Sequence, residues 1–350
     1  MLEIITTRNN PLIDPRLHVW SWEIPVYLFL GGLVAGMMVL AGYQMLKVAR
    51  GEARDSYAVQ APILAFVLIN LGMLALFLDL AHKLYVWRVY LTFEPASPMS
   101  WGSWILILVY GVIAVSALIR LDEAWPWLGR KLPQLGAASR YLIARPAWLR
   151  LIAALNIGFG VALGIYTGIL LSTMVARPLW NSALLGPLFL VSGLSTACAL
   201  MHLLASVVPT NRPAPARMIG GAFAALLQPL TPQPPPKANA VSLVRFDQIL
   251  LPTELTLIVL LLIGLLSSSG AHQNAAALLL GGPYAAVFWG LVVALGLVVP
   301  FALQALELRH RIAHTVLPAV LVLAGGFALR WVLVDAGQAS RLLPVIGLGQ

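Results

Sequence analysis

The chain contains eight separate apolar runs, and no other feature limits its fold as strongly. Each run is long enough for an α-helix that crosses the ~30 Å hydrocarbon core of a bilayer. The runs cover residues 24–47, 57–81, 101–121, 148–174, 184–208, 246–266, 284–306 and 313–334. Only 10% of the residues are charged, whereas a soluble domain has about 25%. The pattern predicts an all-α integral membrane protein with eight transmembrane helices.

Basic residues in the loops predict the orientation of these helices. Fifteen of the 22 Lys and Arg residues fall in the loops after the first, third, fifth and seventh runs, and the other seven, Arg330 among them, are assigned to the opposite side. Loops rich in Lys and Arg stay in the cytoplasm. Both termini are therefore expected on the outer side, the periplasm of a bacterium, with the helices in its inner (cytoplasmic) membrane. The net charge of +9 then reflects membrane orientation and does not indicate nucleic-acid binding.

One loop on the expected outer side, residues 79–104, is dense in aromatic and charged residues. Two interpretations fit this composition. Aromatic and basic side chains anchor many membrane proteins at the lipid interface, and the same residue types can form a docking surface for a partner protein. We assign Trp87 and Arg88 of this loop, together with Arg177, to partner docking.

Polar residues at the expected outer ends of the first two helices form the candidate reaction site. Glu23 and Tyr27 are four residues apart, and Asp79 and His82 are three apart, so each pair is expected to share a helix face. Ionisable groups this close to hydrocarbon are costly and are usually functional. For Asp79, an ion pair with Lys83 four residues later is the structural alternative.

Two further carboxylates, Asp247 and Glu254, lie seven residues apart in the sixth run and so on one helix face. A carboxylate buried in the membrane can relay protons, or it can hydrogen-bond to a neighbouring helix, and the sequence leaves both roles open. The preceding connector, residues 209–245, contains T-P-Q-P-P-P-K and is expected to be extended. Its apolar part, residues 218–230, is too short to span the membrane and is expected to be a flexible linker or to lie along the inner surface.

Cysteine and histidine usage restricts the cofactors. Cys198 is the one cysteine, which excludes an internal disulfide and a cysteine-ligated iron–sulfur cluster in this chain. A haem held by two histidines needs both of them facing each other in the membrane, and only His202 lies deep in a run. The sequence also shows no metal-binding cluster, so we expect neither haem nor metal.

Six segments carry a family resemblance: I-P-V-Y-L-F-L-G-G-L-V-A-G from Ile24, S-P-M-S-W-G-S-W from Ser97, Y-T-G-I-L-L from Tyr166, R-P-L-W-N from Arg177, L-F-L-V-S-G-L-S-T from Leu188 and G-G-F-A-L-R-W-V-L-V-D-A-G-Q from Gly325. In these segments the chain resembles the NrfD-type membrane subunits, the family that includes the membrane anchor of polysulfide reductase. The segments together span nearly the whole chain.

The resemblance implies a single membrane domain of two four-helix bundles, residues 24–174 and 184–334, with a quinone bound in the first. The quinone would be menaquinone or ubiquinone. A ferredoxin-like iron–sulfur subunit would dock nearby and would join a molybdopterin or other catalytic subunit. The positions implied for the quinone site are Tyr27, His82 and Tyr166 as binding residues and Glu23 and Asp79 as catalytic residues.

The expected function is therefore that of a quinone-reacting subunit in a respiratory oxidoreductase complex, with Asp247 and Glu254 on a proton path. The alternative is a secondary transporter. Its support is the pair of membrane carboxylates and a weak repeat between P-V-Y-L-F-L-G-G-L from Pro25 and P-L-F-L-V-S-G-L from Pro187. A transporter would have its site near the bilayer midplane, whereas the polar groups of the first half are expected at the outer edge.

Overall fold

The computed structural model describes residues 20–55, 57–207, 225–230, 236–311, 313 and 315–341. This part of the chain is helical, without strands, and has eight helices long and apolar enough to cross a membrane. They are α1 (Glu23–Ala49), α2 (Tyr57–Asp79), α4 (Pro98–Ile119), α8 (Pro146–Ser172), α9 (Leu185–Val207), α11 (Pro236–Leu266), η3 (Ala286–Val298) continued by α13 (Val299–Leu308), and α14 (Leu317–Ala339). The prediction of an all-α membrane protein with eight spans is confirmed.

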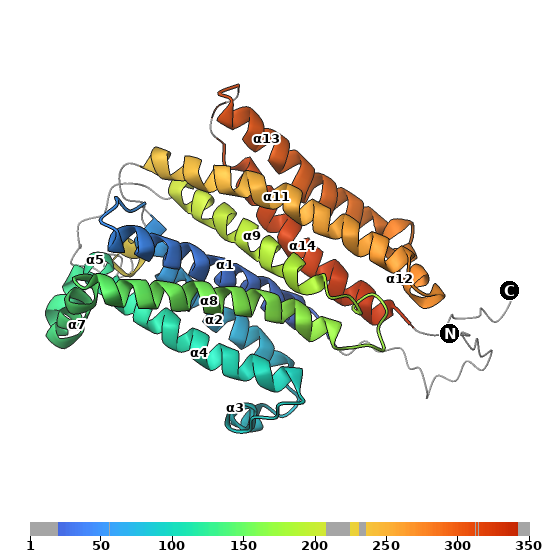
Figure 1. Ribbon diagram of the computed structural model, residues 1–350, viewed down its shortest axis with the longest axis horizontal. Coiled ribbons are helices and arrows are strands. Elements are labelled where there is room, and N and C mark those ends of the chain that lie inside the picture. The colour runs from blue at the N-terminus through green and yellow to red at the C-terminus, as the bar shows by residue number, and fades with distance from the viewer. Residues whose placement is uncertain are drawn as a thin grey trace.

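Shorter helices occupy the connections. They are η1 (Lys83–Tyr85) and α3 (Trp87–Leu91) after α2, α5 (Leu121–Ala124), α6 (Pro126–Lys131) and α7 (Pro133–Ile143) after α4, η2 (Gln228–Leu230) before α11, and α12 (Gly270–Leu280) after α11. Figure 1 shows α3 and α12 toward one end of the bundle and α5 and α7 at the other. We name these ends the α3 side and the α7 side. The α3 side is the one predicted to face outward.

Proline residues set the start of several helices. α4, α6, α7 and α8 each begin with a proline, whose fixed φ suits the first helical turn and whose missing N–H is not needed there. α11 likewise begins at Pro236, the last proline of the predicted extended connector. The expectation of an extended chain is therefore wrong for residues 236–245, which are helical, and residues 209–224 and 231–235 of the connector lie outside the described part.

Helix α1 lies at the centre of the bundle. It packs against α2 and α8 and also against α9 and α14, while α4 packs on α2 and α8, and α11 packs on α9. α1 and α9 approach most closely where two glycines meet, because a Cβ on Gly36 or on Gly193 would collide with the backbone of the other helix. Small residues permit such close contacts between helices in lipid. This contact joins the first four spans to the last four.

Candidate functional site at the α3 side

Three tyrosines from different helices converge at the α3 side of the first four spans. Tyr27 of α1 lies within electrostatic range of Tyr90 on α3 and Tyr166 on α8. Tyr27 and Tyr90 are half-buried, and Tyr166 is buried. The Tyr27 ring faces α2 at Gly72, where an added Cβ would lie 4.0 Å from the ring. Two of the predicted quinone-binding residues are therefore neighbours, Tyr27 on α1 and Tyr166 on α8.

Two carboxylates lie at the same end of the bundle. Glu23 is the first residue of α1 and Asp79 is the last residue of α2, and their charges lie within interaction range of each other. The Oε2 atom of Glu23 is buried and has no hydrogen-bond partner. A buried polar atom without a partner usually marks the place of a water or a ligand. The structure thus brings the two predicted catalytic carboxylates together and leaves one of their oxygens available.

His82 does not share a helix face with Asp79, so that part of the prediction is wrong. α2 ends at Asp79, and His82 lies beyond it with a φ of −113° and a ψ of 69°, just before η1. Its side chain is exposed, and its ring meets the ring of Tyr85 edge-on at 6.5 Å. The helical spacing rule fails because the helix has ended. The alternative for Asp79 is found only as a longer-range attraction. None of the ion pairs between described residues joins Asp79 to Lys83, but the Lys83 charge lies within interaction range of the Asp79 carboxylate.

The S-P-M-S-W-G-S-W segment holds the aromatic loop against α4. The Ser100 hydroxyl accepts a hydrogen bond from the Glu94 N–H at 2.9 Å and donates one to the Thr92 carbonyl at 3.2 Å. The Ser103 hydroxyl donates to the Val89 carbonyl at 3.0 Å, and the Trp101 indole donates to Pro95 O at 2.8 Å. We call these three side chains the serine–tryptophan clamp. They fix the loop that carries Tyr90, which accounts for the composition of this segment.

Gly102 of the same segment makes room for Tyr166. A Cβ at this position would collide with the Tyr166 hydroxyl and ring, so only glycine lets the ring lie against the start of α4. The backbone of Gly102 also hydrogen-bonds to Tyr166. The segment therefore positions two of the three tyrosines, Tyr90 through the clamp and Tyr166 through Gly102.

The three predicted docking residues have different surroundings. Trp87 and Arg88 are exposed on α3, which projects from the bundle in Figure 1. The Arg88 guanidinium lies 4.6 Å from the centre of the Tyr85 ring and 5.5 Å from that of Trp87. Arg177, in contrast, is buried and donates to the carbonyl oxygens of Gln338 and Ser340 at 3.1 and 2.8 Å. Its guanidinium is thus engaged within the chain, where it joins the α8–α9 loop to the end of α14.

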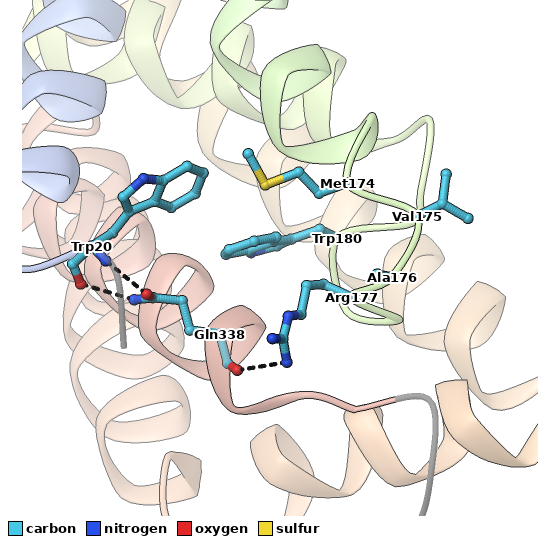
Figure 2. A pocket seen from close by; sticks show the side chains of 7 residues that line it. All are labelled: Trp20, Met174, Val175, Ala176, Arg177, Trp180 and Gln338. Atoms are coloured by element: carbon cyan, nitrogen blue, oxygen red, sulfur yellow. Dashed lines mark hydrogen bonds between the residues drawn. The ribbon is translucent and has the colours of Figure 1, made fainter. Parts of the chain in front are cut away.

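An apolar cavity of about 420 Å³ lies beside Arg177 (Figure 2). Its lining residues are Trp20, Met174, Val175, Ala176, Arg177, Trp180 and Gln338. The rings of Trp20 and Trp180 are 5.2 Å apart, and the Gln338 amide both donates to and accepts from the backbone of Trp20 at 2.9 Å. These contacts hold the chain before α1 on the end of α14 and shape a second hollow at the α3 side.

The second half of the chain contains a buried polar network around Asp247. The Asp247 carboxylate accepts hydrogen bonds from Ser195 at 2.5 Å and from Gln304 at 2.7 Å. Glu254, two helical turns along α11, is also buried and hydrogen-bonds to Ser192. The prediction that the two carboxylates share a buried face is confirmed. Their role in proton transfer remains a prediction.

Arg330 completes this network, and its predicted position outside the membrane is wrong. It was assigned to the outer side, but it lies within α14 and is fully buried. Its guanidinium donates to the Ser192 hydroxyl at 2.6 Å and to the carbonyl oxygens of Gly326 and Phe189 at 2.8 and 3.2 Å. Glu254 lies within electrostatic range across Ser192. An arginine inside an apolar run is itself a signal of function, and it was present in the eighth run.

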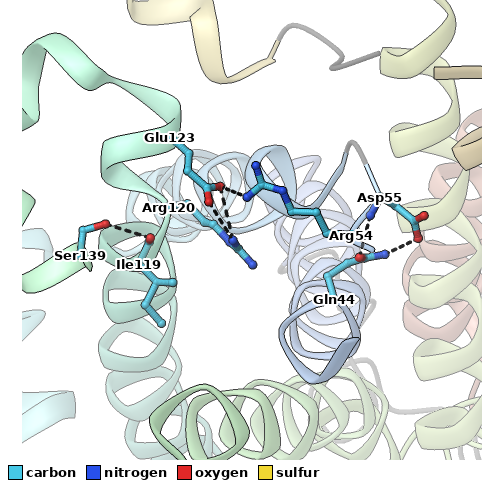
Figure 3. Close-up of polar contacts among 7 residues, drawn as sticks. All are labelled: Gln44, Arg54, Asp55, Ile119, Arg120, Glu123 and Ser139. Atoms are coloured by element: carbon cyan, nitrogen blue, oxygen red, sulfur yellow. Dashed lines mark hydrogen bonds and ion pairs between the residues drawn. The ribbon is translucent and has the colours of Figure 1, made fainter. Parts of the chain in front are cut away.

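A separate polar group closes the α7 side of the first half (Figure 3). Glu123 forms an ion pair with Arg54 and a longer one of 3.4 Å with Arg120. Gln44 and Asp55 exchange hydrogen bonds of 2.6 and 3.1 Å. Burial lowers the pKa of the Arg120 guanidinium and the nearby Glu123 opposes this effect. These contacts tie the loop after α1 to the end of α4, which is a structural role.

The described residues contain no group of three or more His, Cys, Asp or Glu side chains that could hold a metal ion. The α3 side of the first half instead offers hydroxyls, carboxylates and apolar walls, a combination suited to a small organic ligand. Fold and site together define a multi-pass membrane protein with a polar cluster at one surface and a buried polar network in its second half.

Comparison with known proteins identifies the family. A family model described as "Polysulphide reductase, NrfD" matches residues 10–220 and 218–340. The chain belongs to this family, as the resemblance of its six segments predicted.

Curated relatives match almost from end to end. The sequence is 29% identical over 330 residues to the C component of polysulfide reductase from Wolinella succinogenes, covering 91% of this chain and 94% of the relative. It is 28% identical over 336 residues to protein NrfD of Escherichia coli K12, covering 92% and 96%. A partial match of 29% identity, over 54% of this chain and 50% of the relative, is the C component of tetrathionate reductase from Salmonella typhimurium.

Proposed function

We propose that this chain is the quinone-reacting membrane subunit of a respiratory oxidoreductase complex. The observation that carries the proposal is the convergence of three tyrosines and two carboxylates beside a clamped aromatic loop. Membership of the NrfD family supports it, because relatives bear the names of reductase components. The α3 side faces the periplasm of a bacterium in this proposal, as the loop charges predict.

The residues of the cluster fit a quinone head group. A bound quinone supplies two-electron chemistry that needs two protons. The Tyr27 hydroxyl would donate a hydrogen bond to a carbonyl oxygen of the quinone, and the buried Tyr166 would line the site. Glu23 and Asp79 exchange protons with the head group as general acid and base. His82, exposed beyond the end of α2, lies farther toward the surface and hands protons to Asp79.

A partner docks on the exposed face of α3. Trp87 and Arg88 offer an aromatic and cationic surface that is not covered within the described chain. The partner is a ferredoxin-like iron–sulfur protein, joined in turn to a molybdopterin or other catalytic subunit. Because α3 also carries Tyr90, docking places the partner's cluster close to the quinone site. Electrons then pass between the two without a redox centre in this chain.

The buried network of the second half is proposed to move protons. Asp247 and Glu254 lie on one face of α11, Ser195 and Ser192 bind them, and Arg330 supplies a fixed positive charge at the far end. Hydroxyls between carboxylates give a proton short steps along hydrogen bonds. This path serves proton translocation coupled to quinone chemistry in the first half.

The decisive experiment measures the quinone kinetics of Tyr27→Phe in the purified complex. Loss of one hydrogen bond to the head group costs about 0.5–1.5 kcal/mol, so the apparent quinone KM should rise about two- to tenfold. Assembly with the partner should be unchanged. Tyr43→Phe is the matched control, because Tyr43 lies on the same helix but is exposed near the α7 side. A complex that reacts with its soluble substrate but never with quinone analogues would overturn the proposed function.

A further inference from the structure

A further hollow lies on the membrane-facing surface of the first half, apart from the proposed quinone site and from the cavity beside Arg177. It is a groove of about 360 Å³ between α4, α7 and α8, and no polar atom lines it. The lining residues are Gly111, Val112, Val115, Leu118, Leu142, Trp148, Leu151, Ile152 and Leu155. Between Trp148 and Leu155 it follows α8 for about 10 Å. Its walls are partly exposed, Leu151 at 49% and Trp148 at 42%.

A positive charge lies at the α7-side end of this groove. Arg145 directly precedes α8, in the turn between two residues that line the groove: its N–H donates to the Leu142 carbonyl at 3.3 Å, and Trp148 follows three residues later. Its guanidinium lies 4.2 Å from the centre of the Tyr141 ring, and its side chain is exposed. Trp148 lies between this charge and the apolar part of the groove, at the level where tryptophans mark the membrane interface.

The charge of Arg145 is not neutralised by a neighbouring carboxylate. Of the acids in the same loop, Asp122 pairs with Arg140 at 2.5 Å and Glu123 pairs with Arg54. Among the ion pairs between described residues, none includes Arg145. Arg130 and Lys131 of α6 add two further exposed cations on this side. The groove therefore ends in a surface that favours an anion.

We propose that this groove binds one anionic phospholipid, with an acyl chain along α4 and α8 and the phosphate on Arg145. Any apolar groove in a membrane contacts lipid, but here the groove and an uncompensated cation coincide. A cation near the membrane surface favours an anionic lipid by about 1 kcal/mol, which corresponds to about a fivefold preference over a zwitterionic lipid. The acyl chain gains dispersion contacts along a concave wall that a flat helix surface does not offer. The lipid holds α7 against the α4–α8 pair.

Two substitutions separate the groove from the charge. Gly111→Leu fills the groove, and it should not disturb the fold because a Cβ on Gly111 meets no atom within 4 Å. Gly264→Leu is its control, since Gly264 is an equally open glycine on α11, away from the groove. Arg145→Gln removes the charge. Arg150→Gln is its control, because Arg150 is also exposed but does not line the groove.

The test is native mass spectrometry of the full chain within its complex, titrated with phosphatidylglycerol or phosphatidylcholine in detergent. Wild type and both controls should bind one phosphatidylglycerol with about a fivefold preference. Arg145→Gln should lose most of this preference, with only the remainder due to Arg130 and Lys131, and Gly111→Leu should lose the bound lipid. Inorganic phosphate should not compete, because the acyl chain provides most of the binding.

Three results would overturn the proposal. The first is equal binding of the two lipids by wild type. The second is a Gly111→Leu variant that retains its lipid. The third is a stable dimer of this chain that Gly111→Leu dissociates, which would show that a second copy covers the groove.

Discussion

The two halves of the molecule use their polar groups in opposite ways. At the α3 side of the first half, Glu23 has a buried carboxylate oxygen without a partner, and Tyr27 is half-buried among other hydroxyls. In the second half, Asp247 has two side-chain donors and Arg330 has three acceptors. An unsatisfied buried group costs about 1–3 kcal/mol. In the first half this cost falls on a carboxylate oxygen at the candidate site, where a ligand can remove it. In the second half the network spreads its charges through internal bonds, and the Nε atom of Arg330 is the one buried polar atom of these described side chains without a partner.

This difference is the one expected between the proposed ligand site in the first half and a network that contributes to folding in the second. It also explains why the two are joined through α1, which packs against both groups of helices. The guanidinium of Arg330 reaches α1, because a Cβ on Gly32 would lie 2.9 Å from its Nη2 atom. Gly32 is five residues from Tyr27 on the same helix. The closed network and the open cluster are therefore neighbours along one rigid element.

Breaking the closed network should produce the largest effect. Arg330→Met leaves Glu254 without its opposite charge and the Ser192 hydroxyl and Phe189 carbonyl without a donor. Removing one partner of a buried pair costs about 3–5 kcal/mol, and unfolding in detergent micelles should show a loss of this size. The double variant Arg330→Met with Glu254→Gln should recover part of it, because the remaining charge is removed. Unchanged stability of the single variant would show that the second-half network does not contribute to folding.

Altering the position of Tyr166 should cost less and should affect both stability and quinone binding. Gly102→Ala places a methyl group against the Tyr166 ring, and overpacking of this kind costs about 1–3 kcal/mol. Adding Tyr166→Leu should restore stability while the quinone KM stays raised. Gly158→Ala on α8 is the control, because its Cβ would meet no atom within 4 Å. If Gly102→Ala matched this control, Tyr166 would not depend on Gly102.

Asp79→Asn should slow turnover by about tenfold and leave the quinone KM nearly unchanged. General acid–base catalysis contributes about 10²–10⁴-fold in many enzymes, but Glu23 lies within electrostatic range of Asp79 and can take over part of the role. Steady-state kinetics of the assembled complex with a soluble quinone provide the measurement. A raised KM at normal turnover would assign Asp79 to quinone binding. The proposed division between binding tyrosines and proton-exchanging carboxylates would then be wrong.

Arg88→Glu should give the smallest effect and one that depends on salt. Exposed charges contribute about 0.2–1 kcal/mol, so partner affinity should fall by no more than about fivefold at low salt and converge with wild type as salt rises. Arg88→Gln should fall in between at low salt. Co-purification of the partner at several salt concentrations measures this. An effect independent of salt would point to the ring stacking of Arg88 and not to its charge.

The sequence predicted the spans well because hydrocarbon thickness sets a length that apolar runs reveal directly. It placed the end of the second run at residue 81, two residues beyond the end of α2 at Asp79. It did not show that the loop after Asp79 is held by Ser100 and Ser103, which lie about twenty residues later. It also did not predict the helices after α4, whose starts depend on single prolines within a mixed segment.

The candidate site shows a similar division. Glu23, Tyr27 and Asp79 could be found because spacing along one helix and proximity to a helix end are local properties. The contact of Tyr166 with Gly102 joins residues in different spans, and periodicity carries no such information. Arg330 was misplaced because its acceptors include Ser192 and Phe189, more than a hundred residues away. When these acceptors are not known, an arginine near the end of an apolar run is taken for a residue that flanks the helix.

The serine–tryptophan clamp has a mechanical consequence. Its hydrogen bonds run from the aromatic loop to α4. A displacement of α3 is therefore transmitted to the first turns of α4, where Gly102 lies against Tyr166. The clamp therefore links the exposed face of α3 to the proposed quinone site. In the proposed function, binding of a partner to α3 therefore changes the position of Tyr166 before electron transfer begins.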